Sequence, residues 1–317
     1  MRRPRVRLIY NPTAGKEAVR TKLPLILDLL EQGGWEASCH MTKGDVDAIE
    51  AAKQASRDRF DYVIAAGGDG TINEVINGLA QMEYRPPLGI LPAGTTNDLA
   101  RALGLPRDLK KATEIILQKK VVPMDVGQVG EGYFINIAGC GKLTEITYEV
   151  PSKLKTHLGQ LAYYMKGLEK LPSLKAIPLE IDSPEFAYEG KAMLCLIANS
   201  SSVGGFERLA PQASLNDGLF DVIIIKQLHL PDFVKLATLA LKGEHTNSDR
   251  VIYFQTDQVT VNSTETVDLN LDGEFGGPLP QTFRCLKHHL DVFVPTPVPK
   301  VMAPRDEASA GAEVAKK

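Results

Sequence analysis

The stretch Gly67-Gly68-Asp69-Gly70-Thr71-Ile72-Asn73 decides the fold that we predict for this chain. It follows an apolar run, Tyr62–Ala66, and leads into a helical pattern at Thr71–Leu79, so it is a strand-to-helix turn. Its glycines allow a tight turn and the close approach of an anion. The N–H groups at the start of a helix present positive dipole to a phosphate. The stretch therefore predicts a loop that holds the phosphates of a nucleotide.

Strand and helix patterns alternate on both sides of this loop, up to about residue 120. Such alternation predicts a parallel sheet covered by helices. The predicted strands are Val6–Tyr10, Glu36–Met41, Tyr62–Ala66 and Leu88–Pro92, and the predicted helices are Ala18–Gln32, Asp45–Ser56, Thr71–Leu79 and Asn97–Leu103.

The rest of the chain changes in character, because short strand patterns separated by turns dominate it. We predict a mostly antiparallel β-sandwich domain there, with helices at Thr156–Lys170 and Pro231–Lys242. The predicted strands are Val121–Val129, Tyr133–Ala138, Leu179–Ile181, Ala192–Ala198, Leu219–Ile225, Val251–Tyr253, Gln258–Val261, Val267–Leu271 and Leu290–Pro295.

The expected organisation has two domains and a tail. Residues 1–124 form an α/β nucleotide-binding domain, and residues 125–298 form a β-rich domain that binds substrate and metal. The sequence leaves two alternatives for the last strand of the second domain, which either stays in that domain or returns to the first domain. Residues 299–317 are rich in Ala, Glu, Lys and Pro, which predicts a disordered tail.

The composition excludes some classes of protein. The net charge of −3 gives no electrostatic footprint for nucleic acid. The arginines near the N-terminus precede an apolar run that Asn11-Pro12 stops at once, so we expect no signal peptide. Four scattered cysteines favour reduced, buried thiols. We expect a cytoplasmic protein that visits a membrane surface transiently and has no membrane-spanning segment.

Three further polar loops follow predicted strands, as Gly67–Asn73 does. They are Asn11–Gly15, Thr42 and Gly94–Asp98. The carboxyl ends of parallel strands meet at one edge, where open α/β sheets bind ligands. Asp69 would repel phosphate unless a cation lay between them, so it suggests Mg²⁺. The alternative is a plain turn whose glycines serve only its geometry.

Familiar nucleotide motifs do not fit this loop. A Walker A loop needs a Gly-Lys-Ser/Thr sequence, and the dinucleotide fingerprint needs glycine where Asn73 stands. The His-Arg-Asp and Asp-Phe-Gly sequences of protein kinases are absent from the chain. Backbone amides and hydroxyls would therefore hold the nucleotide, with Lys16 as the nearest basic candidate.

Two later turns carry carboxylates. Asp272-Gly273-Glu274 ends a strand pattern of alternating apolar and polar residues, and paired carboxylates accept a hydroxyl proton or bind Mg²⁺. By residue types alone, an exposed hairpin turn is the favoured interpretation. Asn216-Asp217-Gly218 is also a hairpin turn first, because it lacks the ligand spacing of an EF-hand.

Together these motifs resemble the diacylglycerol kinase catalytic superfamily, which also contains sphingosine kinases and NAD kinases. The resemblance begins with Asn11–Gly15, with Gly67–Asn73 followed by Glu74, and with Gly94–Asp98. Later motifs narrow it to the soluble bacterial diacylglycerol kinases: Pro151–Lys155, Ala162–Tyr164, Gly204–Phe206, Gly243–Thr246 and Asp272–Glu274.

The resemblance implies the following roles. ATP would contact Asn11, Pro12, Thr13, Ala14, Gly15, Thr42, Gly67, Gly68, Asp69, Gly70, Thr71, Ile72, Asn73 and Thr95. A structural Mg²⁺ would lie near Ser214, Asp217 and the carbonyl of Leu219, and Asp69, Asp98 and Asp125 would belong to the nucleotide and metal network. Asp272 or Glu274 would be the catalytic base. Apart from the resemblance, the apolar stripe of Thr156–Lys170 favours a core-packed helix with solvated lysines. The alternative is an edge that meets anionic lipid, where Lys166 would also approach phosphate. A homodimer is expected.

The predicted function is ATP-dependent phosphorylation of the free hydroxyl of diacylglycerol, which gives phosphatidic acid. One alternative is a kinase of another lipid or of NAD, and another is a non-catalytic nucleotide-binding protein. The intact Asp272-Gly273-Glu274 argues against the non-catalytic protein. The five later motifs argue against an NAD kinase.

Overall fold

The computed structural model describes residues 2–44, 46–141, 176–201 and 209–302. The chain divides into two compact units. The first contains the chain up to Val126 together with the segment that starts at Lys287, and the second is Gly127–Leu286. Among the described residues, no helix has both the length and the apolar character to cross a membrane.

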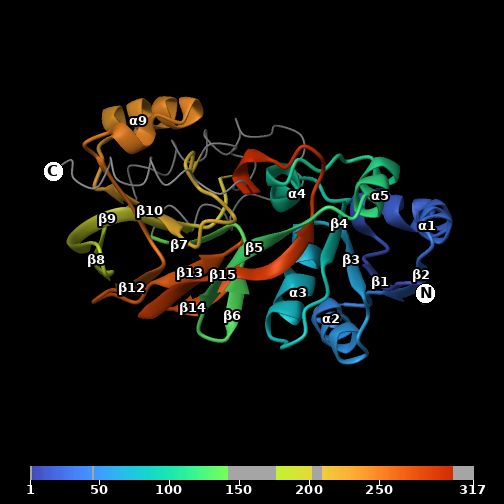
Figure 1. The fold of residues 1–317 in the computed structure, drawn as a ribbon. Helices are drawn as coiled ribbons and strands as arrows, with labels where there is room; N and C mark the ends of the chain where they lie inside the picture. The colour runs from blue at the N-terminus through green and yellow to red at the C-terminus, as the bar shows by residue number, and fades with distance from the viewer. Residues whose placement is uncertain (1, 45, 142–175, 202–208, 303–317) are drawn as a thin grey trace. The chain divides into compact units, whose positions relative to one another are not determined.

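The first unit is the predicted parallel α/β domain. Its strands β1 (Arg5–Tyr10), β2 (Glu36–Met41), β3 (Tyr62–Gly67) and β4 (Leu88–Pro92) are parallel and lie in the order β2-β1-β3-β4. Helices cover both faces of the sheet (Figure 1). They are α1 (Ala14–Gln32), α2 (Asp47–Arg57), α3 (Asp69–Ala80), α4 (Asp98–Ala102) and α5 (Leu109–Leu117).

Alternation along β1 explains how α1 attaches to the sheet. Val6, Leu8 and Tyr10 share one core cluster with Ile26 and Leu30 of α1. Helix α5 was not predicted, although its signals are present in the sequence. Asp108 accepts the N–H of Lys111 as an N-cap, and Leu109, Ala112 and Ile116 share a buried face.

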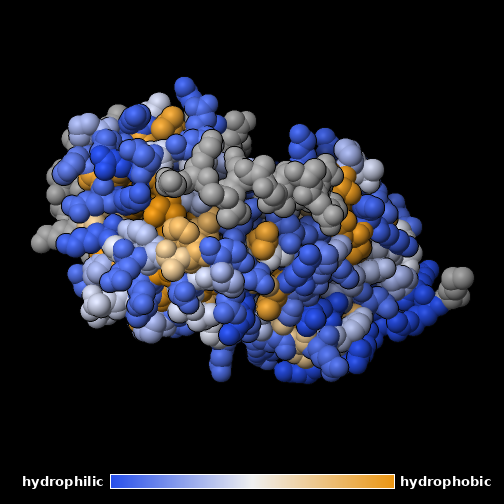
Figure 2. Space-filling view, turned by 60° about the vertical axis from the view of Figure 1, so that its left-hand side comes forward, coloured by the Kyte–Doolittle hydropathy of each residue, from blue (hydrophilic) through white to orange (hydrophobic). Residues whose placement is uncertain are grey.

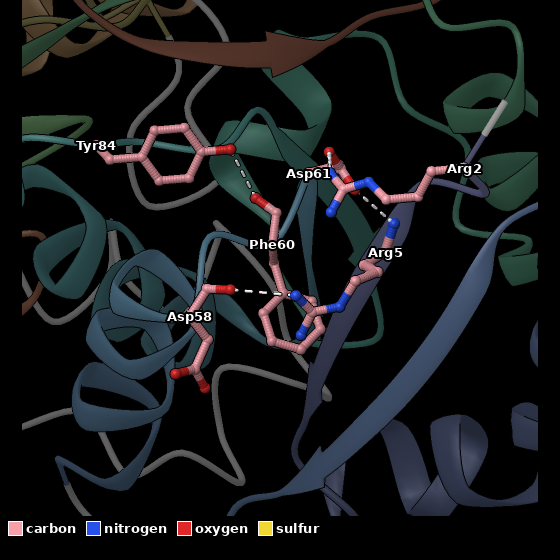
Figure 3. A network of polar contacts seen from close by, with 6 residues as sticks. All are labelled: Arg2, Arg5, Asp58, Phe60, Asp61 and Tyr84. Carbon is pink, nitrogen blue, oxygen red and sulfur yellow. Dashed lines mark hydrogen bonds and ion pairs between the residues drawn. The ribbon is translucent and has the colours of Figure 1, made fainter.

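Arg2 and Arg5, near the N-terminus, are bound to the first unit. The Arg2 guanidinium and the Arg5 backbone N–H donate to the two carboxylate oxygens of Asp61, each at 2.7 Å (Figure 3). The Arg5 guanidinium also lies 4.3 Å from the centre of the Phe60 ring. The Tyr84 hydroxyl donates to the Phe60 carbonyl oxygen at 2.8 Å. These contacts fix the start of β1 beside the start of β3.

The second unit is mostly antiparallel, as predicted. Its longest path of strands runs β14-β13-β7-β9-β8-β12-β15, and β10 joins β9 to β11. The bounds are β5 (Val121–Val129), β6 (Gly132–Phe134), β7 (Ile137–Cys140), β8 (Ile177–Asp182), β9 (Ala187–Ala198), β10 (Phe220–Lys226), β11 (Val251–Thr256), β12 (Gln258–Asn262), β13 (Asp268–Leu271), β14 (Glu274–Pro278) and β15 (Gln281–Phe293). Helix α9 spans Leu230–Lys242, and the 3₁₀ helix η2 spans His245–Asn247.

The structure differs from the expected strands at three places. The predicted strand Tyr133–Ala138 is two strands, because Ile135 and Asn136 interrupt the strand between β6 and β7. Strand β14 was missed. The predicted strand Leu290–Pro295 is the end of the long β15, whose Val292 pairs in parallel with Leu88 of the first unit's sheet.

Side chains of the central strands alternate between two cores. Ala138, Cys140 and Cys195 belong to one buried cluster, whereas Ile137 and Leu196 belong to another. Cys140 and Cys195 are directly opposite in the β7–β9 pair. The hydrogen bond with Cys140 raises the pKa of the Cys195 thiol, and burial adds to the rise.

All four cysteines are free thiols, as expected, but Cys39 is exposed and Cys285 is only partly buried. It lies on β2, the outermost strand of its sheet. The predicted helix Thr156–Lys170 lies outside the described residues. Of the predicted tail, Lys300–Met302 form a 3₁₀ helix in which Met302 is buried, and the structure describes nothing after it.

Large apolar side chains are rare on the surface. The face shown in Figure 2 is largely hydrophilic, with hydrophobic residues in separate groups. Within the described ranges, the exposed large hydrophobic residues are Met41, Val46 and Phe275.

Candidate functional site

The four predicted loops follow four parallel strands and therefore share one edge of the first sheet. Asn11 donates its backbone N–H to Ala66 at the end of β3, and Thr42 donates to Tyr10 at the end of β1. The Ala93 N–H after β4 donates to the Gly67 carbonyl oxygen at 2.8 Å. Backbone hydrogen bonds thus join the loops in the order of the strands.

The loop after β1 is a compact polar turn. The Asn11 side-chain oxygen accepts from both the N–H and the hydroxyl of Thr13. Gly15, Lys16 and Glu17 all have left-handed backbones, with φ of 58°, 58° and 65°. Regular helix therefore begins at Ala18, as predicted. A Cβ on Gly15 would lie 2.3 Å from the Ala93 carbonyl oxygen, so only glycine fits there.

The loop after β3 approaches the loop after β4 at its glycines. A Cβ on Gly94 would lie 2.6 Å from the Gly68 Cα. Gly70 is exposed, while Thr71 and Ile72 bury their side chains. Asn73 accepts from the Asn77 amide through its own side chain. Any contact of Thr71 with phosphate would therefore use its backbone N–H, which the first turn of a helix leaves available. The Ile72 N–H already donates to the Gly68 carbonyl oxygen at 3.1 Å.

Asp69 joins these two loops through its carboxylate. One oxygen accepts the Asn97 N–H at 2.8 Å, and the other accepts the Asp98 N–H at 2.7 Å. Burial raises the pKa of the Asp69 carboxyl above its usual value, and the Asp98 charge raises it further. Both oxygens already accept hydrogen bonds, so Asp69 is placed to shape the edge rather than to hold a metal directly.

Several residues that shape the edge were not predicted as site residues. Asn97 is buried, with φ of 53°, and its amide both donates to and accepts from the Gly94 backbone. Arg101 and Arg107 donate to the carbonyl oxygens of Thr96 and Thr95. Asn97 had a signal in the sequence, because asparagine tolerates the left-handed backbone that ends such a turn.

Asp125, on β5 in the first unit, is fully buried. Its carboxylate accepts the His288 N–H at 2.7 Å, where β15 has a left-handed residue. The structure therefore gives Asp125 a role in fixing β15. Lys166 lies outside the described residues.

The predicted structural metal site is a tight turn in the second unit. The Ser214 hydroxyl accepts the Asn216 N–H at 3.3 Å, and the Asp217 carboxylate accepts the Leu219 N–H at 3.0 Å. These residues offer the oxygen donors that Mg²⁺ prefers, but only one carboxylate. The described part of the chain contains no group of three His, Cys, Asp or Glu side chains with metal-binding geometry.

The two candidate bases have different surroundings. The Asp272 carboxylate accepts three backbone N–H groups, from Ile135 at 2.6 Å, Asn136 at 2.9 Å and Ile137 at 2.8 Å. Asp272 and Gly273 have left-handed φ values of 50° and 100°. Glu274 begins β14 and is exposed. Asp272 thus fixes the turn that presents Glu274.

Comparison with known proteins agrees with this arrangement. A family model of the diacylglycerol kinase catalytic domain matches residues 5–129, and one of the YegS C-terminal NAD kinase beta sandwich-like domain matches residues 145–294. A diacylglycerol kinase from Bacillus subtilis (strain 168) is 53% identical over 92% of this chain and 96% of its own length. One from Staphylococcus saprophyticus is 44% identical over 93% of this chain and 97% of its own.

A solved structure gives the same result. The crystal structure of a diacylglycerol kinase from Bacillus anthracis str. Sterne aligns with a TM-score of 0.76 at 25% sequence identity, over 94% of this chain and 99% of that one. The matches confirm the predicted resemblance and the predicted order of an α/β domain before a β-sandwich domain.

Proposed function

This chain belongs to the diacylglycerol kinase family, and we propose that it transfers the γ-phosphate of ATP to the free hydroxyl of diacylglycerol, which gives phosphatidic acid. The observation that carries the proposal is the turn in which Asp272 accepts three N–H groups while Glu274 stays exposed. A carboxylate held in this way suits general-base catalysis on a hydroxyl.

ATP would bind at the carboxyl edge of the first sheet. The backbone N–H groups of Gly67–Asn73 and the start of α3 would hold its phosphates. Asn11–Gly15, Thr42 and Thr95 would border the nucleotide, and Lys16, which is exposed, would add positive charge. The hydrogen bonds of Asp69 with the loop after β4 support this assignment, because they fix the edge before any nucleotide arrives.

Glu274 would act as the base. Its carboxylate accepts the hydroxyl proton of diacylglycerol as that oxygen forms a bond to the γ-phosphorus. The bond from the γ-phosphorus to the bridging oxygen breaks, and ADP leaves with the electron pair. Asp272 would be a positioning residue, because its oxygens already accept N–H groups.

Mg²⁺ belongs to the proposal as well. When bound with ATP, it would offset negative charge on the phosphates. Asp69 and Asp98 would lie near it, and a second ion would use Ser214, Asp217 and the Leu219 carbonyl. We also propose a homodimer that meets its lipid transiently at a membrane surface, where Lys166 would face anionic groups.

A phosphoryl-transfer assay tests the function. The purified protein is incubated with labelled ATP, Mg²⁺ and detergent micelles that carry diacylglycerol, sphingosine or no lipid, and one further reaction contains NAD. We expect label in phosphatidic acid. Label in sphingosine phosphate or NADP alone, or in no product, would contradict the proposal.

A further inference from the structure

A buried amide in the second unit has hydrogen-bond donors without an acceptor. Asn270 of β13 is 8% exposed, and its side-chain oxygen accepts the Gly273 N–H at 2.9 Å. That bond requires oxygen on this side, so it fixes the orientation of the amide. The Nδ2 group meets no acceptor among the residues that the structure describes. Buried donors are normally satisfied, so this one calls for a ligand or a water.

The neighbours of Asn270 in the sheet suggest what kind of ligand this is. Strand register puts it directly opposite Phe275 of the outermost strand β14 and, on its other side, opposite Gly139 of β7. Directly opposite residues of antiparallel strands share a face. Gly139 has no side chain, and Phe275 is 68% exposed. The next residue in the row is Leu196, which belongs to a buried apolar cluster.

We propose that Asn270 and Phe275 bind the ester end of the lipid substrate. Asn270 Nδ2 donates to an ester carbonyl oxygen, and the Phe275 ring packs on the first methylenes of that acyl chain. This inference rests on the proposed function. The free group is a donor, so its partner must be an acceptor. Ester carbonyls are acceptors only, whereas the reacting hydroxyl gives its proton to Glu274.

The position of Glu274 fits this assignment. It directly precedes Phe275, and consecutive strand residues point to opposite faces. Because β14 is the edge strand, a glycerol backbone that passes around it places the ester on the Asn270 face and the hydroxyl at Glu274. The proposed lipid contact at Phe275 and the proposed proton transfer at Glu274 are thus adjacent residues of the same edge strand.

A change in the substrate tests the contact. The enzyme is assayed with a diacylglycerol and with the dialkyl ether of equal chain length, which lacks the carbonyl oxygens. We expect wild type to prefer the ester about three- to tenfold in kcat/KM, as one hydrogen bond allows. Asn270→Asp keeps an oxygen for Gly273 and removes the donors, and Asn270→Ala removes both. Each should treat ester and ether alike, with the KM for ATP unchanged.

Phe275 has a matched control. Phe275→Ser should raise the KM for both lipids two- to fivefold, and Phe275→Leu should restore it. Val46→Ser removes another exposed apolar side chain, which is 62% exposed in the first unit, and should change neither KM. Since Phe275 is exposed, its variants test the site even if substitutions at Asn270 prevent folding.

Failure of the inference and failure of the function are distinguishable. Wild type without preference for the ester, or Asn270→Asp that keeps the preference, would overturn the inference while the kinase activity stands. Wild type without lipid kinase activity would overturn the function. Co-sedimentation with vesicles that carry a diester lacking the free hydroxyl, or its diether counterpart, then measures the contact without turnover. Equal binding of the two by wild type would reject it.

Discussion

Two glycine-containing turns, one in each unit, use an aspartate in the same way. Asp69 of the first unit accepts two backbone N–H groups from the loop after β4. Asp272 of the second accepts three from the break between β6 and β7. In the sequence, both carboxylates suggest metal binding or catalysis. In the structure, the carboxylate oxygens of both aspartates accept hydrogen bonds from backbone N–H groups.

The two turns differ in the chemical groups that lie beside the aspartate. Around Asp69, the available groups are backbone N–H groups at the start of α3, which suit phosphate. Beside Asp272, Glu274 exposes a carboxylate, which suits proton transfer. In both turns the aspartate supports the backbone, and under the proposed function its neighbours bind phosphate or accept a proton.

The largest expected effect separates the two carboxylates of the second turn. Glu274→Gln should lower kcat about 10²- to 10⁴-fold, because it removes the proposed base, and should leave the free energy of unfolding nearly unchanged. Asp272→Asn keeps one oxygen for Asn136 and Ile137 but turns an NH₂ group toward the Ile135 N–H. It should lower the free energy of unfolding by about 1–3 kcal/mol.

Steady-state kinetics and urea unfolding of both variants decide between these roles. The pH profile of kcat in Asp272→Asn should keep the shape of wild type. If Asp272→Asn instead abolished turnover at unchanged stability, and Glu274→Gln kept turnover, the roles would have to be exchanged.

The second effect compares the two aspartates directly. Asp272→Ala should destabilise the protein by about 3–4 kcal/mol and Asp69→Ala by about 2–3 kcal/mol, because three N–H groups lose their acceptor in one and two in the other. Burial and the Asp98 charge already oppose ionisation of Asp69, which reduces its contribution. Urea midpoints measure both, and a larger loss for Asp69→Ala would contradict the comparison.

The sequence predicted the first turn better than the second for a physical reason. Parallel strands have their loops at one edge, so alternation alone placed Gly67–Asn73 beside Gly94–Asp98. Nothing local connects Asp272 with Ile135, which lies 137 residues away in the chain. The sequence does not indicate that the strand is interrupted after β6, where those N–H groups become exposed, because Ile135 and Asn136 continue an apolar strand pattern.

Side-chain roles were harder to predict than elements. The strands and most helices followed from periodicity, and β14 was missed because Glu274–Pro278 contains two glycines and a proline. The negative charge of Asp69 can be recognised in the sequence, and it led to the prediction of Mg²⁺ beside the phosphates. Its two hydrogen bonds depend on the backbone of Asn97 and Asp98, and backbone N–H groups carry no residue-specific signal.

A smaller difference is expected in the loss of stability when alanine replaces either of two glycines with positive φ. Gly15 has φ of 58° and a Cβ there would lie 2.3 Å from Ala93, whereas Gly273 has φ of 100° and no described atom within 4 Å of its Cβ position. Gly15→Ala should therefore destabilise by about 2–3 kcal/mol and Gly273→Ala by about 1–2 kcal/mol. Thermal and urea unfolding measure the order, and equal losses would show that the contact with Ala93 adds nothing.

The smallest effect is a pH dependence peculiar to the first turn. The pKa of Asp69 is raised by burial and by Asp98, so the folded protein keeps this proton at a pH where the unfolded chain has lost it. The stabilisation from this group is therefore complete below the unfolded pKa and is lost as the pH rises through the folded pKa. Asp69→Asn does not titrate, so the difference in unfolding free energy between the two should shift in favour of Asn as the pH rises from about 4 to 7. Urea unfolding at steps of half a pH unit measures the shift. A difference that is constant over this range, or that moves toward Asp, would mean that the two N–H bonds outweigh burial and that Asp69 is ionised as readily in the folded protein as in the unfolded chain.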